Sequence, residues 1–120
     1  MWLTAEKTKK IGYELWYQLW KHPESKYKDD LLNYDQEAIE AYQAVRFFAE
    51  NCVFCEYDAQ MRIKNDMLDD LTNDCYYCPL KGKNNDCCHG YFRKWALSED
   101  RKTRKLYAKA ILDLISNWKV

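Results

Sequence analysis

The sequence predicts an all-α protein, with three or four helices packed around an aromatic core. Three glycines and two prolines among 120 residues leave few points at which a helix would be interrupted. Five Trp, ten Tyr and four Phe supply a large hydrophobic core for a chain of this length. No segment alternates apolar and polar residues for long enough to indicate a strand. We therefore expect residues 1–120 to form a single helical domain.

The first helix is expected to follow Thr4, a suitable N-cap residue, with Glu6 in the first turn. Pro23 disfavours the α conformation in the residue before it, so the helix should end within residues 21–25. Its wide apolar stripe recurs every four residues and consists of Ile11, Leu15 and Leu19, with Trp16 and Trp20 beside them.

A second helix is expected to begin near Asn33, with Gln36 as its capping-box partner, and to run through Phe48. Whether it continues past Cys52 to about Met61 is open. In a continuous helix, Cys52 and Cys55 would be neighbours on one face, because their spacing is i and i+3.

The last helix has the cleanest helical periodicity in the chain. Ser98 is its expected N-cap, with Glu99 and Asp100 favourably placed at the positive end of the helix dipole. A short helix is expected at 66–72, and 75–90 should be irregular because its apolar residues show no period. The apolar positions of the last helix are Leu106, Tyr107, Ala110, Ile111, Leu114, Ile115 and Trp118.

Six cysteines lie between positions 52 and 89, and four of them form two Cys-x-x-Cys pairs separated by nineteen residues. This spacing is typical of a four-thiolate zinc site, in which each pair holds one side of a tetrahedral ion. We therefore expect a closed, structural Zn²⁺ site within residues 52–89 that pins the irregular segment 75–90. The expected ligands are Cys52, Cys55, Cys75 and Cys78, with Cys87 and Cys88 as alternates and His89 as a further candidate.

Other cysteine chemistry fits the pattern less well. The three closely spaced cysteines of a ferredoxin-type cluster are missing, and no βαβ pattern accompanies the Cys-x-x-Cys pairs as in thioredoxin-like proteins. Disulfides remain an alternative if the chain is secreted. We expect a cytoplasmic protein instead, because neither a signal peptide nor a membrane-spanning run of apolar residues is present. In that reducing compartment, clustered cysteines more often bind metal.

Formal net charge is zero, but the two signs are separated along the chain. Residues 28–74 hold twelve Asp or Glu against four Lys or Arg, whereas residues 75–109 hold nine Lys or Arg against three Asp or Glu. Such asymmetry can mark a binding surface or only a solvated helix face. The sequence contains two histidines, no glycine-rich phosphate loop and no Ser–His–Asp pattern, so we expect no enzymatic activity.

Two binding surfaces follow from this asymmetry. An acidic helix face, represented by Asp66, Asp69 and Asp70, could dock on the basic groove of a nucleic-acid enzyme. Alternatively, a basic segment at 93–109 could bind nucleic acid directly, with Tyr91, Phe92 and Trp95 as stacking surfaces. The phosphate-contacting residues would then be Lys94, Arg101, Lys102, Arg104 and Lys105.

The middle third of the chain resembles small cysteine-rich proteins of phages and prophages. The residues that carry the resemblance are Cys52-Val-Phe-Cys55, then Cys75-Tyr-Tyr-Cys78-Pro-Leu, then Cys87-Cys88-His89-Gly-Tyr followed by Trp95. Zinc-containing type II anti-CRISPR proteins are among them, and these bind the CRISPR effector nuclease and block its engagement with DNA. The resemblance implies a non-catalytic inhibitor of a host defence protein in the bacterial cytoplasm. It supports the cysteine ligands and identifies no partner-binding residue. The alternative is a small zinc-dependent nucleic-acid-binding regulator.

Overall fold

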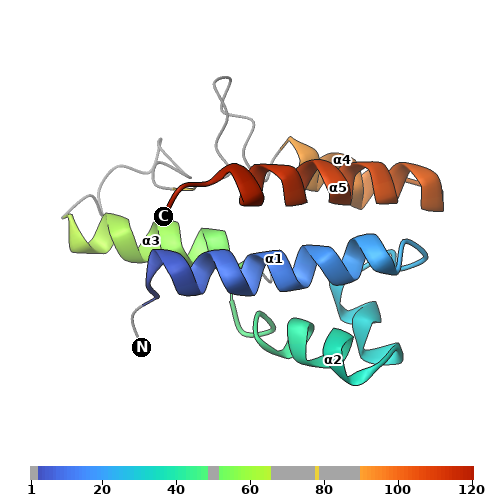
Figure 1. Cartoon of the computed structure of the whole chain (residues 1–120), viewed down its shortest axis with the longest axis horizontal. Helices are drawn as coiled ribbons and strands as arrows, with labels where there is room; N and C mark the ends of the chain where they lie inside the picture. The colour runs from blue at the N-terminus through green and yellow to red at the C-terminus, as the bar shows by residue number, and fades with distance from the viewer. Residues whose placement is uncertain (1–2, 49–51, 66–77, 79–89) are drawn as a thin grey trace.

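Every regular element in the described part of the chain is a helix. The computed structural model describes residues 3–48, 52–65, 78 and 90–120 (Figure 1). The all-α prediction is confirmed over these ranges. In chain order the elements are α1 (Ala5–Lys21), the 3₁₀ helix η1 (Lys28–Asn33), α2 (Gln36–Gln43), α3 (Val53–Lys64), α4 (Tyr91–Leu97) and α5 (Arg101–Asn117).

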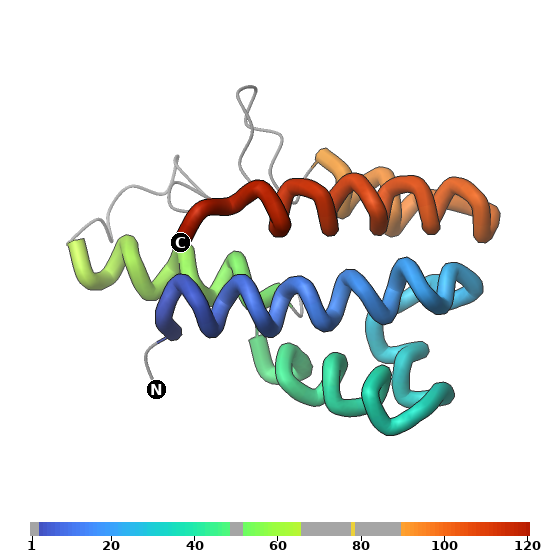
Figure 2. The backbone as a smooth tube through the Cα atoms, in the orientation of Figure 1, coloured from blue at the N-terminus to red at the C-terminus, as the bar shows by residue number. Residues whose placement is uncertain are grey.

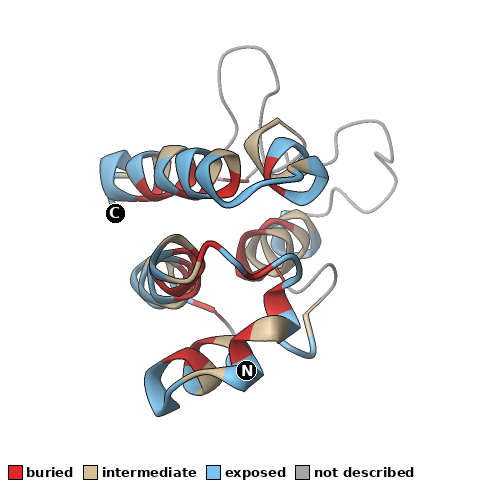
Figure 3. Ribbon diagram, turned by 90° about the vertical axis from the view of Figure 1, so that its right-hand side faces the viewer, coloured by how far each residue is buried: buried red, intermediate tan, exposed pale blue. Residues whose placement is uncertain are grey.

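The helices form three layers, with α1 and α3 in the middle (Figure 3). On one side of them lie α4 and α5, and on the other lies α2. The 3₁₀ helix η1 packs on α2 and also reaches α4 through Lys28, whose ammonium lies 4.4 Å from the Phe92 ring centroid. Figure 2 shows α5 running beside α1 in the opposite direction. Helix α1 packs against α5, α2, α3 and η1, so it is the central element of the fold. Because neighbours cover it on several sides, it needs the wide apolar stripe that its sequence carries.

Helix α1 begins and ends where its capping residues predict. The Thr4 hydroxyl accepts a hydrogen bond from the backbone N–H of Lys7 at 3.1 Å, which satisfies one of the unpaired donors of the first turn. The helix stops at Lys21, two residues before Pro23. Leu15 and Leu19 are almost completely buried, so the predicted stripe is the face that enters the core.

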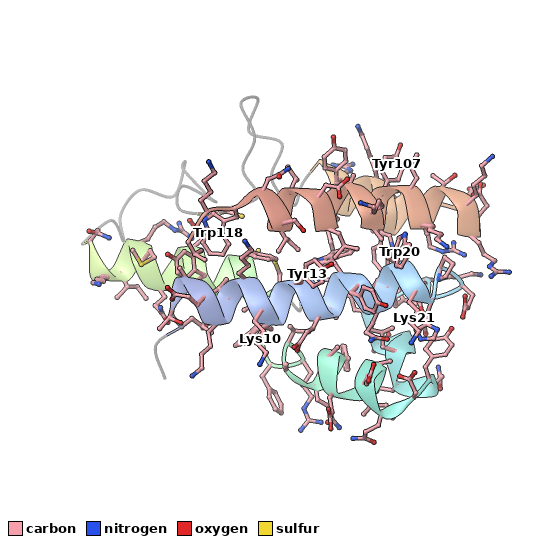
Figure 4. All side chains as sticks on the ribbon, viewed as in Figure 1. Lys10, Tyr13, Trp20, Lys21, Tyr107 and Trp118 are labelled. Atoms are coloured by element: carbon pink, nitrogen blue, oxygen red, sulfur yellow. The ribbon has the colours of Figure 1, made fainter. Side chains whose placement is uncertain are left out.

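Aromatic rings fill much of that core. The Trp16 ring meets the Trp95 ring edge-on, with centroids 5.3 Å apart and planes at 83°. At the other end of the molecule, Trp118 packs edge-on against Phe54 and Tyr57, at centroid distances of 6.3 and 5.7 Å. Figure 4 shows Trp118 at the end of α5, near α3. Edge-to-face pairs of this kind add directional attraction to the burial of the rings.

The second predicted helix is wrong in its start, in its run through Phe48 and in its possible extension to Met61. Asp35 is the N-cap, and its Oδ1 accepts the Ala38 N–H at 3.0 Å, whereas Asn33 ends the 3₁₀ helix η1. Helix α2 ends at Gln43, and α3 begins separately after Cys52. Asp is as good an N-cap residue as Asn, and η1 ends at Asn33, so the cap falls two residues later. The expected helix at 66–72 lies outside the described residues, as does most of 75–90.

The start of the last helix also differs from the prediction. Its N-cap is Asp100, whose Oδ1 accepts the Thr103 N–H at 2.7 Å. Ser98 instead follows the last residue of α4, a helix that the sequence did not predict, and its hydroxyl donates to the Lys94 carbonyl at 2.6 Å. Leu106 was predicted to belong to the apolar stripe of this helix, but its side chain is 63% exposed. The buried face runs instead through Ala108, Ile111, Leu112 and Ile115.

Gly12 lets α3 approach α1 closely. A Cβ atom at this position would overlap the ring of Phe54, which is 1% exposed. We predict that Gly12→Ala lowers the free energy of unfolding by about 1–2 kcal/mol, because overpacking costs more than the better helix propensity of alanine returns. Urea unfolding of Gly12→Ala, Phe54→Leu and the double variant measures this. The double variant should be more stable than the two single losses added together imply. Additive losses would contradict the contact.

Capping of α5 by a carboxylate predicts a pH dependence. The hydrogen bond from the Thr103 backbone N–H holds the pKa of Asp100 below its ordinary value of 3.8. A carboxyl with a depressed folded-state pKa stabilises the fold above its ordinary pKa, and this contribution is lost as pH falls through the folded-state pKa. Asp100→Asn keeps a capping oxygen but carries no charge. In urea titrations, wild type should therefore be the more stable protein at neutral pH, and the difference should vanish in acid. A difference that persists in acid would show that charge is not the cause.

Candidate metal centre and charged surfaces

Cys52 and Cys55 lie together at the N-terminus of α3. Cys52 is the N-cap residue, in extended backbone conformation, and its Sγ accepts a hydrogen bond from the Cys55 backbone N–H at 3.4 Å. Cys55 is therefore the third residue of the helix. The two side chains are neighbours at one helix end although no continuous helix joins α2 to α3.

Two features of this placement act in opposite directions on the thiolate form that binds a metal. The N-terminus of a helix carries partial positive charge, and an N–H donated to sulfur stabilises a negative charge there. Cys52 is 7% exposed and belongs to the hydrophobic core cluster, and Cys55 packs against it half-buried. A negative sulfur in such surroundings needs compensation by a cation. The pair thus fits one half of a four-thiolate zinc site.

Cys78 is the third expected ligand that the structure describes. It is 5% exposed and belongs to the same hydrophobic cluster as Cys52. Cys75, the alternates Cys87 and Cys88, and His89 lie outside the described residues. Within the described residues, no three His, Cys, Asp or Glu side chains form a group that could hold a metal. The zinc site and its choice of ligands therefore stay a prediction.

Sequence reasoning missed the capping role of Cys52. The three-residue offset between the cysteines is also the offset between an N-cap residue and the N3 position of a capping box. That spacing was the available signal for a helix start at Cys52. The sequence leaves a continuous helix open, and a helix start at Cys52 was not among the predictions.

Arg104 was predicted to contact phosphate, but it does not lie on the surface. Its side chain is buried, at 4% exposed, and its Nε donates to the Pro23 carbonyl at 2.7 Å. One of its terminal nitrogens also donates to the Ser98 carbonyl at 3.2 Å. Arg104 thus joins the turn after α1 to the turn before α5, and this correction removes it from any phosphate contact. Lys94, Arg101, Lys102 and Lys105 are exposed.

Several of the remaining cations already have partners. The ammonium of Lys105 lies 4.8 Å from the Trp20 ring centroid, and that of Lys94 lies 5.7 Å from the Tyr91 ring centroid. A terminal nitrogen of Arg101 lies 3.9 Å from a carboxylate oxygen of Glu24. Burial alone would raise the pKa of Glu24, but it is outweighed. A backbone hydrogen bond, the Tyr34 hydroxyl and the charges of His22 and Arg101 leave this pKa below its ordinary value.

Trp95 was predicted to form part of a stacking surface, but it is buried. This side chain is 2% exposed and packs against Trp16 in the core, so no nucleic-acid base can stack on it. Tyr91 and Phe92 are half-buried. Trp95 was predicted to face solvent because it lies next to a basic segment. The packing of α4 and α5 on α1 instead places its ring in the core.

An acidic layer lies on the opposite side of the molecule. Residues 28–43, which form η1 and α2, contain a single Lys or Arg. That residue, Lys28, is 5% exposed, and its ammonium lies 4.4 Å from the Phe92 ring centroid. The surface charge of this layer is therefore negative. Asp66, Asp69 and Asp70, the predicted partner-binding residues, lie outside the described residues. The acidic layer consists of Asp29, Asp30, Asp35, Glu37 and Glu40.

Comparisons of this chain with protein-family models, curated proteins and solved structures found no match. Among the helices of the described ranges, none is long and apolar enough to cross a membrane.

The variant Cys52→Ser distinguishes the helix-capping role of Cys52 from its proposed role as a metal ligand. Serine is a preferred N-cap residue of similar size, so Cys52→Ser keeps the cap and loses the thiolate. We predict a large fall in melting temperature, because a structural zinc contributes about 10–16 kcal/mol of apparent binding free energy to folding. Cys55→Ser should behave in the same way. The measurement is thermal unfolding with and without a zinc chelator.

The chelator supplies the control. It should lower the melting temperature of wild type and leave that of Cys52→Ser almost unchanged, because the variant has already lost its metal. Wild-type melting temperatures for both serine variants would contradict the metal centre and leave Cys52 as a helix cap only.

Proposed function

We propose that this protein is a zinc-stabilised binding protein without catalytic activity, encoded by a phage or another mobile element, that inhibits a host defence protein. The target we propose is a type II CRISPR effector nuclease, in agreement with the resemblance of the cysteine-rich segment. The observation that carries the proposal is the acidic layer, which presents several carboxylates from η1 and α2 and buries its single cation.

A negative layer is suited to a basic nucleic-acid channel. Such a channel is lined by Lys and Arg that contact phosphates, and a protein surface with one sign of charge can occupy the same place. Charge complementarity raises the association rate at low ionic strength. Because the basic residues of α5 lie in the layer opposite α2, they do not cancel this attraction at the carboxylates of α2 (Figure 1).

Zinc has a structural role in this proposal. Residues 75–90 contain few apolar side chains, so a metal would supply the folding free energy that burial cannot. Helix α3, which carries Cys52 and Cys55 at its start, packs directly on α1. Metal binding would therefore stabilise the same middle layer on which the acidic layer packs.

The nucleic-acid-binding alternative is less well supported. It needed five cations and three aromatic rings on one surface, and Arg104 and Trp95 are buried in the core. Lys105 is engaged with an aromatic ring, and Arg101 faces a carboxylate. The remaining positive charge is therefore weaker than the sequence alone implied.

The direct test is cleavage of a DNA substrate by a guide-loaded type II CRISPR nuclease. We predict inhibition when the protein is added before DNA and much weaker inhibition when it is added after, because both occupy the same basic channel. Glu40→Lys should weaken inhibition at least about tenfold. Lysine near the end of α2 is compatible with the helix dipole, so the variant should fold.

Lys102→Glu is the matched control, since it reverses one exposed charge in the opposite layer. It should inhibit like wild type. A labelled DNA duplex without nuclease should show no shift. Loss of activity in Lys102→Glu but not in Glu40→Lys, together with a salt-sensitive duplex shift, would replace the proposed inhibitor with the nucleic-acid-binding regulator.

A further inference from the structure

An open groove lies between α1 and α2. Its volume is about 400 Å³, within the range of small-molecule and side-chain binding sites. Two tyrosines one turn apart on α1 form part of its wall, and their rings are stacked with centroids 6.3 Å apart. Tyr13 is 41% exposed and Tyr17 is 38% exposed, so the rings are open to an incoming group. Figure 4 labels Tyr13 on α1. The complete lining is Tyr13, Glu14, Tyr17, Gln18, Glu37, Glu40 and Ala41.

The lining carries negative charge only. Glu14 comes from α1, and Glu37 and Glu40 come from α2. Lys21, which Figure 4 shows on the α2 side of α1, lies 3.8 Å from a carboxylate oxygen of Asp35. One oxygen of Glu40 accepts a hydrogen bond from the Gln36 side chain at 3.2 Å. The groove therefore combines three carboxylates with two aromatic faces and contains no lysine or arginine.

Gln18, beside the groove, has an unused hydrogen-bond acceptor. This side chain is 4% exposed, and its Oε1 has no hydrogen-bond partner. A buried carbonyl oxygen without a donor is costly, by about 1–3 kcal/mol, and native proteins rarely leave one. Gln18 also lines the groove, so a rotation of its side chain that turns this oxygen toward the groove would let an entering donor satisfy it.

We propose that this groove binds an arginine side chain of a basic segment in a partner protein. A guanidinium carries five N–H donors in a plane, which can bind a glutamate carboxylate and, after the rotation of the Gln18 side chain, Gln18 Oε1 as well. Its flat face stacks on tyrosine rings and is attracted to them by the cation–π interaction. A lysine ammonium lacks the plane and is more strongly hydrated, so it fits these features less well.

The inference deepens the proposed function, and it rests on that proposal only for the identity of the partner. Three carboxylates repel phosphate, so nucleic acid is excluded as the occupant. An arginine-rich segment of a nucleic-acid enzyme has the required chemistry. The groove shares Glu37 and Glu40 with the acidic layer, so it would be the point within that layer at which one partner side chain is inserted.

The test uses the full chain and a fluorescein-labelled peptide of alternating arginine and glycine. Fluorescence anisotropy gives its affinity at an ionic strength of about 0.15 M. We expect the matched lysine–glycine peptide to bind several-fold more weakly. Gln18→Met should weaken arginine-peptide binding about tenfold, because it removes an acceptor for a charged donor. The same variant should melt at or above the wild-type temperature without peptide, because the unpaired oxygen is gone.

Two double variants with equal net charge control for simple attraction. Glu37→Gln with Glu40→Gln removes two groove charges, whereas Glu6→Gln with Glu99→Gln removes two exposed charges elsewhere. Only the first should weaken binding by about tenfold or more. Equal affinity for the two peptides, equal loss in the two double variants, or unchanged binding by Gln18→Met would overturn the arginine site.

The peptide result is independent of the nuclease result. Specific arginine binding without inhibition of a CRISPR nuclease would uphold the groove and contradict the proposed target. Inhibition that survives Gln18→Met, with the peptide bound as tightly as by wild type, would contradict the groove and leave the proposed function standing.

Discussion

The close packing of α3 on α1 at Gly12 is the contact on which the rest of the structure depends. Only a residue without a Cβ lets the Phe54 ring lie against the α1 backbone. Because Phe54 is the second residue of α3, this contact fixes the start of that helix and the position of the N-cap Cys52. A metal held by Cys52 and Cys55 would thus be anchored in the middle layer. Helix α1 also packs against α5 on one side and α2 on the other.

The acidic and basic residues lie in different segments of the sequence, and the fold places these segments in different layers. The chain as a whole is neutral, yet η1 and α2 carry the acidic layer while α5, on the far side of α1, carries four exposed cations, Arg101, Lys102, Lys105 and Lys109. The protein therefore has two surfaces of opposite charge, although its net charge is zero. Such an arrangement gives a preferred orientation to an approaching charged partner.

Local signals predicted the parts of the fold that depend on local physics. The Thr4 cap, the stop before Pro23 and the burial of Leu15 and Leu19 follow from short-range sequence patterns, and each agrees with the structure. The helix starts at Asp35 and Asp100 were displaced by two residues, because neighbouring polar residues offered equivalent caps.

Features that depend on tertiary packing could not be read from the sequence. Arg104 and Trp95 belong to a basic aromatic segment that looks solvent-facing, and only the layer arrangement buries them. The groove side chains Tyr13, Tyr17 and Gln18 lie on the side of α1 that α2 partly covers. The sequence does not show which helix packs against that side of α1. The repeated pair of a tyrosine followed by a glutamate or glutamine, four residues apart, was the available signal.

Native mass spectrometry of the protein as purified, without added metal, tests the central claim most directly. We expect a mass increase of one zinc ion per chain, with two of the six cysteines still open to alkylation. A mass lower by six protons with no metal would mean that the cysteines form three disulfides. That result would contradict the metal centre and the cytoplasmic setting on which the proposed function rests.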